Sequence, residues 1–165
     1  MQSAQVLDVK NFMQLLLQSE AFDTYETVEA VIRTDMTYSI DGKLNRDFYS
    51  EDELSAMFPE DISFVTWQYA KPKVFDIIKG KRTPSYMKIV FKVNKAALDS
   101  VLNADNSSHN SNNIAGVYFN ITFKEQILNV TCSVSYKNFT LDKNLELEIF
   151  SNFTTLLKSN NIAIN

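Results

Sequence analysis

The chain has 165 residues, a formal net charge of −4 and a hydrophobic content of 45%, values that fit one globular domain and exclude a disordered chain. One cysteine and one histidine exclude a disulfide-stapled scaffold and a zinc site built from several Cys or His ligands. The N-terminal segment lacks a signal-peptide pattern, and no apolar run approaches the roughly 20 residues of a membrane span. We therefore expect a cytoplasmic protein with no membrane partner.

Residues 8–33 predict a capped helix followed by a strand. The Asp8 carboxylate can accept the free N–H groups of a first helical turn, so a helix is expected over residues 9–18. The acid-rich stretch 20–29 leads into a strand, and its carboxylates are expected to spread along a solvated face. The strand residues expected to face the core are Val28, Ala30 and Ile32.

The next signals are a turn and a helix start. Asp41-Gly42 is a strong two-residue hairpin signal, so residues 37–40 are expected to pair with residues 43–46. Ser50 and Glu53 have the spacing of a capping box, in which each side chain satisfies a backbone donor of the other residue. A short helix is therefore expected to begin there.

Residues 67–93 predict a helix, a basic turn and a half-buried strand. The helix is expected to begin either near Trp67, which we expect in the core, or near Pro72, which suits a first turn because it has no N–H. Gly80 fits the position just after the helix, where a left-handed backbone costs glycine little. The period then changes to two, which places Lys88 on the polar face of the strand.

A short helix and a polar loop follow. Asn94 can cap a helix over residues 95–102, and the polar, low-complexity loop at about 103–113 is expected to be mobile. The only histidine, His109, lies in this loop. A catalytic histidine needs a fixed orientation and a partner group, so we expect His109 to be solvated rather than catalytic.

The C-terminal third predicts a hairpin, a long helix and a short strand. Alternation over residues 116–136 is the clearest in the chain and predicts two antiparallel strands with Cys132 on the core face. A thiol buried among apolar groups has a raised pKa and is inert. Asp142 can cap the last helix, and residues 162–165 are expected to add a short edge strand.

The predicted fold class is α+β, a mainly antiparallel β-sheet with helices packed on one face, in a single domain over residues 1–165. Helices at both ends and in the middle surround five or six strands, several of them joined as hairpins. Strict alternation of strands and helices is absent, which argues against a doubly wound parallel sheet.

Several short motifs resemble an uncharacterised bacterial family, a domain of unknown function. The central motif joins Ile78-Lys-Gly-Lys-Arg-Thr-Pro84 to Met87-Lys-Ile-Val-Phe91. The others are Val9-Lys-Asn-Phe-Met13, Glu20-Ala-Phe-Asp23, Ser39-Ile-Asp-Gly-Lys-Leu-Asn45 and Phe139-Thr-Leu-Asp-Lys143. The resemblance covers most of the chain, which supports one domain, and it implies no substrate, cofactor or catalytic residue.

The basic turn is the local feature with a functional interpretation. Lys79, Lys81 and Arg82 lie within four residues, Lys88 is on the following strand, and such a cluster suits a phosphate or a nucleic-acid backbone. The alternative is helix-end chemistry, because cations also stabilise the negative end of a helix dipole. No glycine-rich phosphate loop of a known type accompanies the run.

We therefore expect a non-enzymatic binding or protein-interaction module of unknown ligand, with no catalytic residue, metal or cofactor. One alternative is a protein that contacts nucleic acid or phosphate through the Lys79–Arg82 turn. Another is a carboxylate–metal enzyme that uses Asp41 or the stretch 20–29. The partners considered are a second copy of the chain, another protein and nucleic acid.

Overall fold

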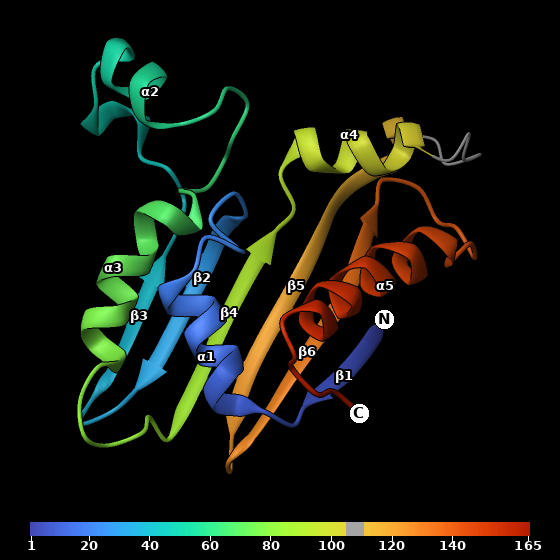
Figure 1. Ribbon diagram of the computed structural model, residues 1–165. Helices are drawn as coiled ribbons and strands as arrows, with labels where there is room; N and C mark the ends of the chain where they lie inside the picture. The colour runs from blue at the N-terminus through green and yellow to red at the C-terminus, as the bar shows by residue number, and fades with distance from the viewer. Residues whose placement is uncertain (105–110) are drawn as a thin grey trace.

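The computed structural model describes residues 1–104 and 111–165, which build a six-stranded antiparallel sheet in the order β1-β6-β5-β4-β2-β3 (Figure 1). The strands are β1 (Gln2–Val6), β2 (Glu26–Arg33), β3 (Thr37–Asp41), β4 (Tyr86–Lys92), β5 (Ile114–Lys124) and β6 (Ile127–Tyr136). Every neighbouring pair is antiparallel, so the predicted α+β class is confirmed.

Helices cover one face of this sheet. They are α1 (Val9–Gln18), α2 (Glu51–Met57), α3 (Trp67–Ile78), α4 (Lys95–Ala104) and α5 (Asn144–Ser159). Figure 1 shows α1, α3 and α5 lying across the same side of the strands, with α2 and α4 beyond one end of the sheet. The opposite face carries no helix in the described part of the chain, and we call it the outer face. No helix among the described residues has the length and apolar character needed to cross a bilayer.

The helix starts follow the predicted capping chemistry. The Asp8 carboxylate accepts the N–H of Asn11 at 3.1 Å, and the capping box between Ser50 and Glu53 is formed. The Asn94 side chain accepts the N–H of Ala97 at 2.7 Å at the start of α4. These local bonds satisfy donors that a helix leaves unpaired, which is why they could be predicted without tertiary information.

The start of the last helix differs slightly from expectation, and the structure decides between the two starts predicted for the central helix. Asp142 accepts the N–H of Asn144 at 2.9 Å, although the residue at the cap position of α5 is Lys143. Helix α3 begins at Trp67, the first of the two predicted starts, so Pro72 lies inside the helix and not in the first turn. Gly80 follows the helix with a φ of +148°, a conformation that suits glycine.

The main core lies between the helices and the sheet. Its largest fully buried side chains include Trp67, Phe12, Phe22, Phe91 and Phe119. Burying each such side chain contributes about 1.5–3 kcal/mol. The Trp67 indole N–H donates to the backbone oxygen of Leu16 at 2.9 Å, which ties α3 to α1. Trp67 is thus a core ring, as predicted.

The predicted hairpin at Asp41-Gly42 is wrong. Strand β3 ends at Asp41 and pairs with β2, and the turn between these two strands lies at residues 34–36. Gly42 instead donates its N–H to the oxygen of Val28 at 3.0 Å. A Cβ at this position would overlap the carbonyl oxygen of Thr27, so close backbone approach, not turn geometry, requires the glycine.

A bulge in β2 changes which residues face the core. The register with β4 shifts between Thr27 and Glu29, and this shift ends the alternation on which the prediction relied. Ala30 and Ile32 are buried as predicted, but Val28 is only half-buried and Thr27 takes the core position. Glu26, predicted to lie on a solvated face, is 3% exposed. Glu26 is therefore a carboxylate that is largely removed from solvent.

The two ends of the described chain lie side by side at one edge of the sheet. Backbone bonds join Gln5 to Asn165 in both directions, at 3.0 and 2.9 Å, and the N–H of Leu7 donates to Ala163 at 2.9 Å. The short C-terminal edge strand predicted from the sequence is present only as an isolated antiparallel bridge between Val6 and Ile164. Strand β1, which this segment covers, has a largely polar sequence and was not predicted. Of the predicted polar loop, residues 105–110 with His109 lie outside the described residues.

Candidate functional site

The basic turn predicted from the sequence lies between α3 and β4 and projects into solvent. Lys79, Lys81 and Arg82 are all exposed. The Lys79 ammonium is 2.9 Å from the carboxylate of Asp76, in an ion pair whose two side chains are both well exposed. Within the described part of the chain, neither Lys81 nor Arg82 forms an ion pair. Two cations of the turn are therefore available to an external anion.

The end of the turn is fixed to the neighbouring strand. Pro84 is buried, and Ser85 donates its backbone N–H to the oxygen of Arg33 at 3.0 Å. This bond brings the last residue of β2 next to the turn. The Arg33 guanidinium lies 5.5 Å from the ring centroid of Tyr86, in a cation–π contact. Arg33 is thus a further exposed cation at this site, contributed by a distant part of the sequence.

The sheet register adds another cation. Tyr86 pairs with Arg33 on one side and with Lys124 on the other, so the three residues form one row across β2, β4 and β5. We call the set at this end of the sheet the basic edge. Its members are Arg33, Lys79, Lys81, Arg82 and Lys124. Strand alternation could have indicated the faces of Arg33 and Lys124, but only the pairing register places them beside the predicted turn.

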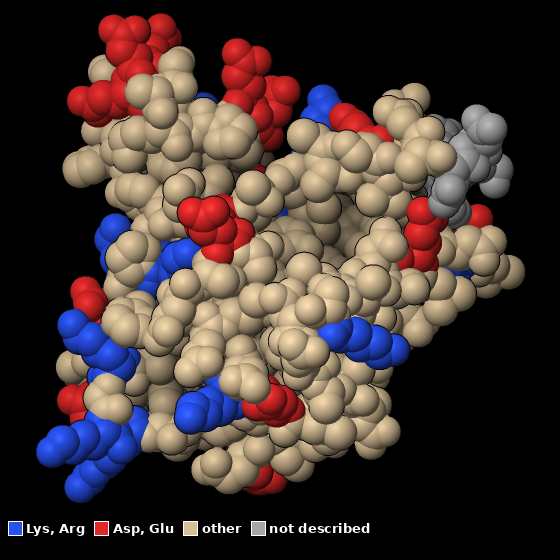
Figure 2. Space-filling model, in the orientation of Figure 1, with Lys and Arg blue, Asp and Glu red and all other residues tan. Residues whose placement is uncertain are grey.

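Charge is segregated along the molecule. Figure 2 shows Lys and Arg side chains gathered at the lower left, where Figure 1 places the end of α3 and the β2–β3 turn. Asp and Glu side chains gather at the opposite end, over α2 and the loop that follows it. One end of the molecule is therefore basic although the net charge of the whole chain is −4.

Lys88, the fourth predicted site residue, lies on the outer face of β4 and is the next residue after Tyr86 on that face. Its ammonium is 2.5 Å from the carboxylate of Glu29, and the two side chains are 37% and 39% exposed. The hydrogen bond that Lys88 donates to the Glu29 carboxylate raises the pKa of Lys88, which stays fully charged at neutral pH. A second anion would have to share Lys88 with this carboxylate, so Lys88 is a weaker anion site than Lys81 or Arg82.

Two tyrosines flank this stretch of the outer face. Tyr86 and Tyr118 lie on the adjacent strands β4 and β5, on the face opposite the buried residues Met87, Ile89 and Phe91. The Tyr118 ring lies over Gly116, since a Cβ added there would be 2.8 Å from its hydroxyl oxygen. Both rings are only half-buried. The outer face therefore combines cations with accessible aromatic surface.

A family model for a family of unknown function, DUF5721, matches residues 14–165. The chain belongs to DUF5721. No curated protein and no solved structure matches it. The resemblance inferred from the sequence motifs is therefore confirmed at the level of the family.

In this DUF5721 chain, the carboxylates considered for a metal site are held apart by other partners. Asp23 pairs with Lys71 at 2.6 Å, and the Asp41 carboxylate accepts the N–H of Lys43 at 2.9 Å. Glu26 accepts backbone N–H groups, as described below. Among the described residues, no group of three or more His, Cys, Asp or Glu side chains could hold a metal ion.

The single cysteine of the DUF5721 chain lies on the core face of β6. Cys132 is fully buried, and burial raises the pKa of its thiol to about 12. Burial raises the pKa of the nearby Tyr25 hydroxyl to about 12 as well. Both groups are protonated at neutral pH, so Cys132 does not supply the thiolate that nucleophilic catalysis needs.

Proposed function

We propose that this protein is a non-enzymatic binding module that contacts nucleic acid through the basic edge and the adjoining outer face. The observation that carries the proposal is the gathering of five cations from three separate segments at one end of an otherwise acidic molecule. A cytoplasmic location, where nucleic acid is present, is part of the proposal.

Phosphate is the anion that this edge suits best. Lys81 and Arg82 are exposed and form no ion pair with a described residue, so a phosphate need not displace an internal partner. The planar guanidinium of Arg82 can bind two phosphate oxygens at once, whereas Lys81 acts as a point charge. Release of counterions from the polymer then favours binding and makes it sensitive to salt.

The tyrosines favour a single strand over a duplex. Bases of an unpaired strand can stack on accessible aromatic rings, and each stacked base contributes about 1–3 kcal/mol. Tyr86 lies at the basic edge, and Tyr118 lies further along the same face on the neighbouring strand. A strand whose phosphates contact Lys81 and Arg82 can continue along β4 past Lys88.

Fluorescence anisotropy with a labelled oligothymidylate tests the proposal. The Lys81→Ala/Arg82→Ala variant should bind more weakly, and the slope of log K against log salt should fall by about 1.4, because each lost phosphate contact on a single strand removes about 0.7. The matched control is Lys143→Ala/Lys158→Ala, which removes the same charge from exposed positions at the two ends of α5, on the β6–β1 side of the sheet.

The outcomes separate the alternatives. Equal weakening by the two double variants would mean that only total charge matters, and the proposed interface would be wrong. Competition by poly-glutamate as strong as that by unlabelled oligothymidylate would indicate an acidic protein partner instead. Unchanged binding and unchanged salt slope in Lys81→Ala/Arg82→Ala would also reject the proposal.

A further inference from the structure

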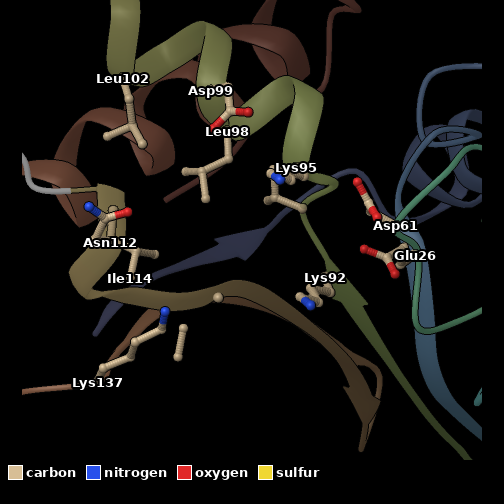
Figure 3. A pocket seen from close by; sticks show the side chains of 13 residues that line it. Glu26, Asp61, Lys92, Lys95, Leu98, Asp99, Leu102, Asn112, Ile114 and Lys137 are labelled. Carbon is tan, nitrogen blue, oxygen red and sulfur yellow. The ribbon is translucent and has the colours of Figure 1, made fainter.

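A cavity of about 350 Å³ lies at the opposite end of β4 from the basic turn. It is bounded by the end of β4, the start of β2, the first half of α4 and the start of β5 (Figure 3). Its apolar floor includes Val93, Leu98 and Ile114. The volume is at the lower end of the range of small-molecule sites in proteins, about 300–1,000 Å³.

Six charged side chains line this cavity in equal numbers of each sign. They are Glu26, Asp61, Asp99, Lys92, Lys95 and Lys137. In Figure 3, Glu26 and Asp61 lie together on one side, Lys92 and Lys95 lie next to them, and Lys137 reaches in from the far side. Within residues 1–104 and 111–165, no ion pair joins one of these lysines to one of these carboxylates.

Glu26 is the least accessible of these charges. It is 3% exposed, and its Oε1 accepts the backbone N–H groups of Ser63 at 2.7 Å and Phe64 at 3.1 Å. A carboxylate has about four acceptor positions, and these bonds use only those of one oxygen. The other oxygen, Oε2, accepts no hydrogen bond from the described residues, although Glu26 lines the cavity. Glu26 Oε2 is therefore open to the cavity, where it can accept a hydrogen bond from a ligand donor.

The cavity walls are held in place without a ligand. The Asn94 side chain accepts the N–H of Ala97 at 2.7 Å and donates to the oxygen of Thr24 at 2.9 Å, which fixes the start of α4 over the start of β2. The backbone N–H of Lys137 donates to the oxygen of Asn113 at 2.7 Å, which fixes the far wall. The site is therefore largely pre-formed, so little ordering cost accompanies binding.

We infer that this cavity binds a small molecule that carries both an amine and an oxyanion group, with the amine at Glu26 and Asp61 and the carboxylate or phosphate at the lysines. A simple anion at Lys92 would approach the carboxylates and be repelled. A simple cation at Glu26 would approach the lysines and be repelled by them. A ligand that carries both charges complements both groups at once. This inference is independent of the proposed nucleic-acid contact.

Calorimetric titration and thermal shift test the inference with defined probes. The probes are the L-amino acids, each titrated alone, and O-phosphoethanolamine, which carries a phosphate in place of the carboxylate. Acetate and methylammonium each supply one of the two charges. We expect at least one zwitterion to bind and to raise the melting temperature, and both single-charge compounds to fail. Binding only by O-phosphoethanolamine would identify phosphate as the oxyanion.

Variants then test the location. Glu26→Gln preserves an acceptor for Ser63 and Phe64, and it should weaken binding about tenfold or more by removing the charge opposite the amine. Lys92→Met should weaken binding to a similar extent, and it does not touch the bonds that hold residues 63–64. Lys158→Met is the matched control, because Lys158 is exposed in the last turn of α5 and does not line the cavity.

Three results would overturn the inference. The first is the absence of any zwitterion with a Kd below about 10 mM. The second is binding that neither Glu26→Gln nor Lys92→Met weakens. The third is equally tight binding of acetate or methylammonium alone, which would mean that the two signs of charge do not act together.

Discussion

Replacement of Glu26 by alanine is expected to destabilise the protein far more than the same change three residues away. In the native structure, Glu26 Oε1 accepts two backbone N–H groups and the residue is 3% exposed. A hydrogen bond to a charged group contributes about 1.5–3 kcal/mol, so two bonds contribute about 3–6 kcal/mol. Water from the adjacent cavity can reach the freed N–H groups. We therefore expect a loss near the lower end, about 3 kcal/mol.

Two comparison variants separate charge from hydrogen bonding. Glu26→Gln retains an oxygen for Ser63 and Phe64 but loses the charge, which roughly halves the strength of such bonds, so the expected loss is about 1–2 kcal/mol. Glu29→Ala is the control on the same strand. Its carboxylate is 39% exposed and pairs with Lys88, and an exposed ion pair contributes about 0–1 kcal/mol.

Urea unfolding followed by fluorescence measures these differences. Trp67 is the only tryptophan and is fully buried, so its emission reports on loss of the core. The midpoints should rank wild type and Glu29→Ala highest, then Glu26→Gln, then Glu26→Ala, with unchanged slopes. A Glu26→Ala protein no less stable than Glu29→Ala would show that the buried carboxylate does not stabilise the segment before α3.

Three other changes have expected outcomes. Gly42→Ala should lower the free energy of unfolding by at least about 3 kcal/mol or prevent folding, because its Cβ would overlap the Thr27 carbonyl oxygen. The yield of soluble protein and its circular dichroism spectrum test this expectation. Trp67→Phe should cost about 2 kcal/mol in urea unfolding, because it removes the hydrogen bond to Leu16 and leaves a cavity. The pKa of Cys132 is raised to about 12 by folding, so stability should fall as pH rises above about 9, by up to about 1.4 kcal/mol per unit, and Cys132→Ala should flatten this decline.

Local chemistry accounts for the parts of the fold that the sequence predicted correctly. The caps at Asp8, Ser50 and Asn94 depend on residues within three positions of each other, and each forms as expected. The hairpin of β5 and β6 has regular alternation and a short connection, where Glu125 and Gln126 adopt positive φ. Neither feature needs information from distant segments.

Long-range contacts account for the errors. Asp41-Gly42 has the composition of a turn, but the position of Gly42 against the bulged start of β2 decides its role. That bulge also moves Thr27 into the core and Glu26 out of solvent, which alternation alone cannot predict. Strand β1 is a largely polar edge segment whose partner is more than a hundred residues away.

The candidate site also combines residues that the sequence could identify with residues that only the fold brings together. The turn residues Lys79, Lys81 and Arg82 could be identified as a cluster because they are adjacent in sequence. Arg33 and Lys124 join them only through the pairing of three strands. The charged cavity at Glu26 is lined by residues from five separate parts of the chain, and no local pattern marks it.

The order of strands in the sheet also sets the order in which the protein can fold. The first half of the chain supplies β1, β2 and β3, which occupy the two outer parts of the sheet, and the second half supplies the three strands between them. During synthesis on the ribosome, β1 leaves the exit tunnel long before β6, and β2 leaves it before β4. β2 and β3 can pair with each other early, but β1 and the second edge of β2 have no partner until the later strands are made, so closure of the sheet must come late. A pause in translation before residue 127 would prolong the interval in which those strand edges are open to association with other chains.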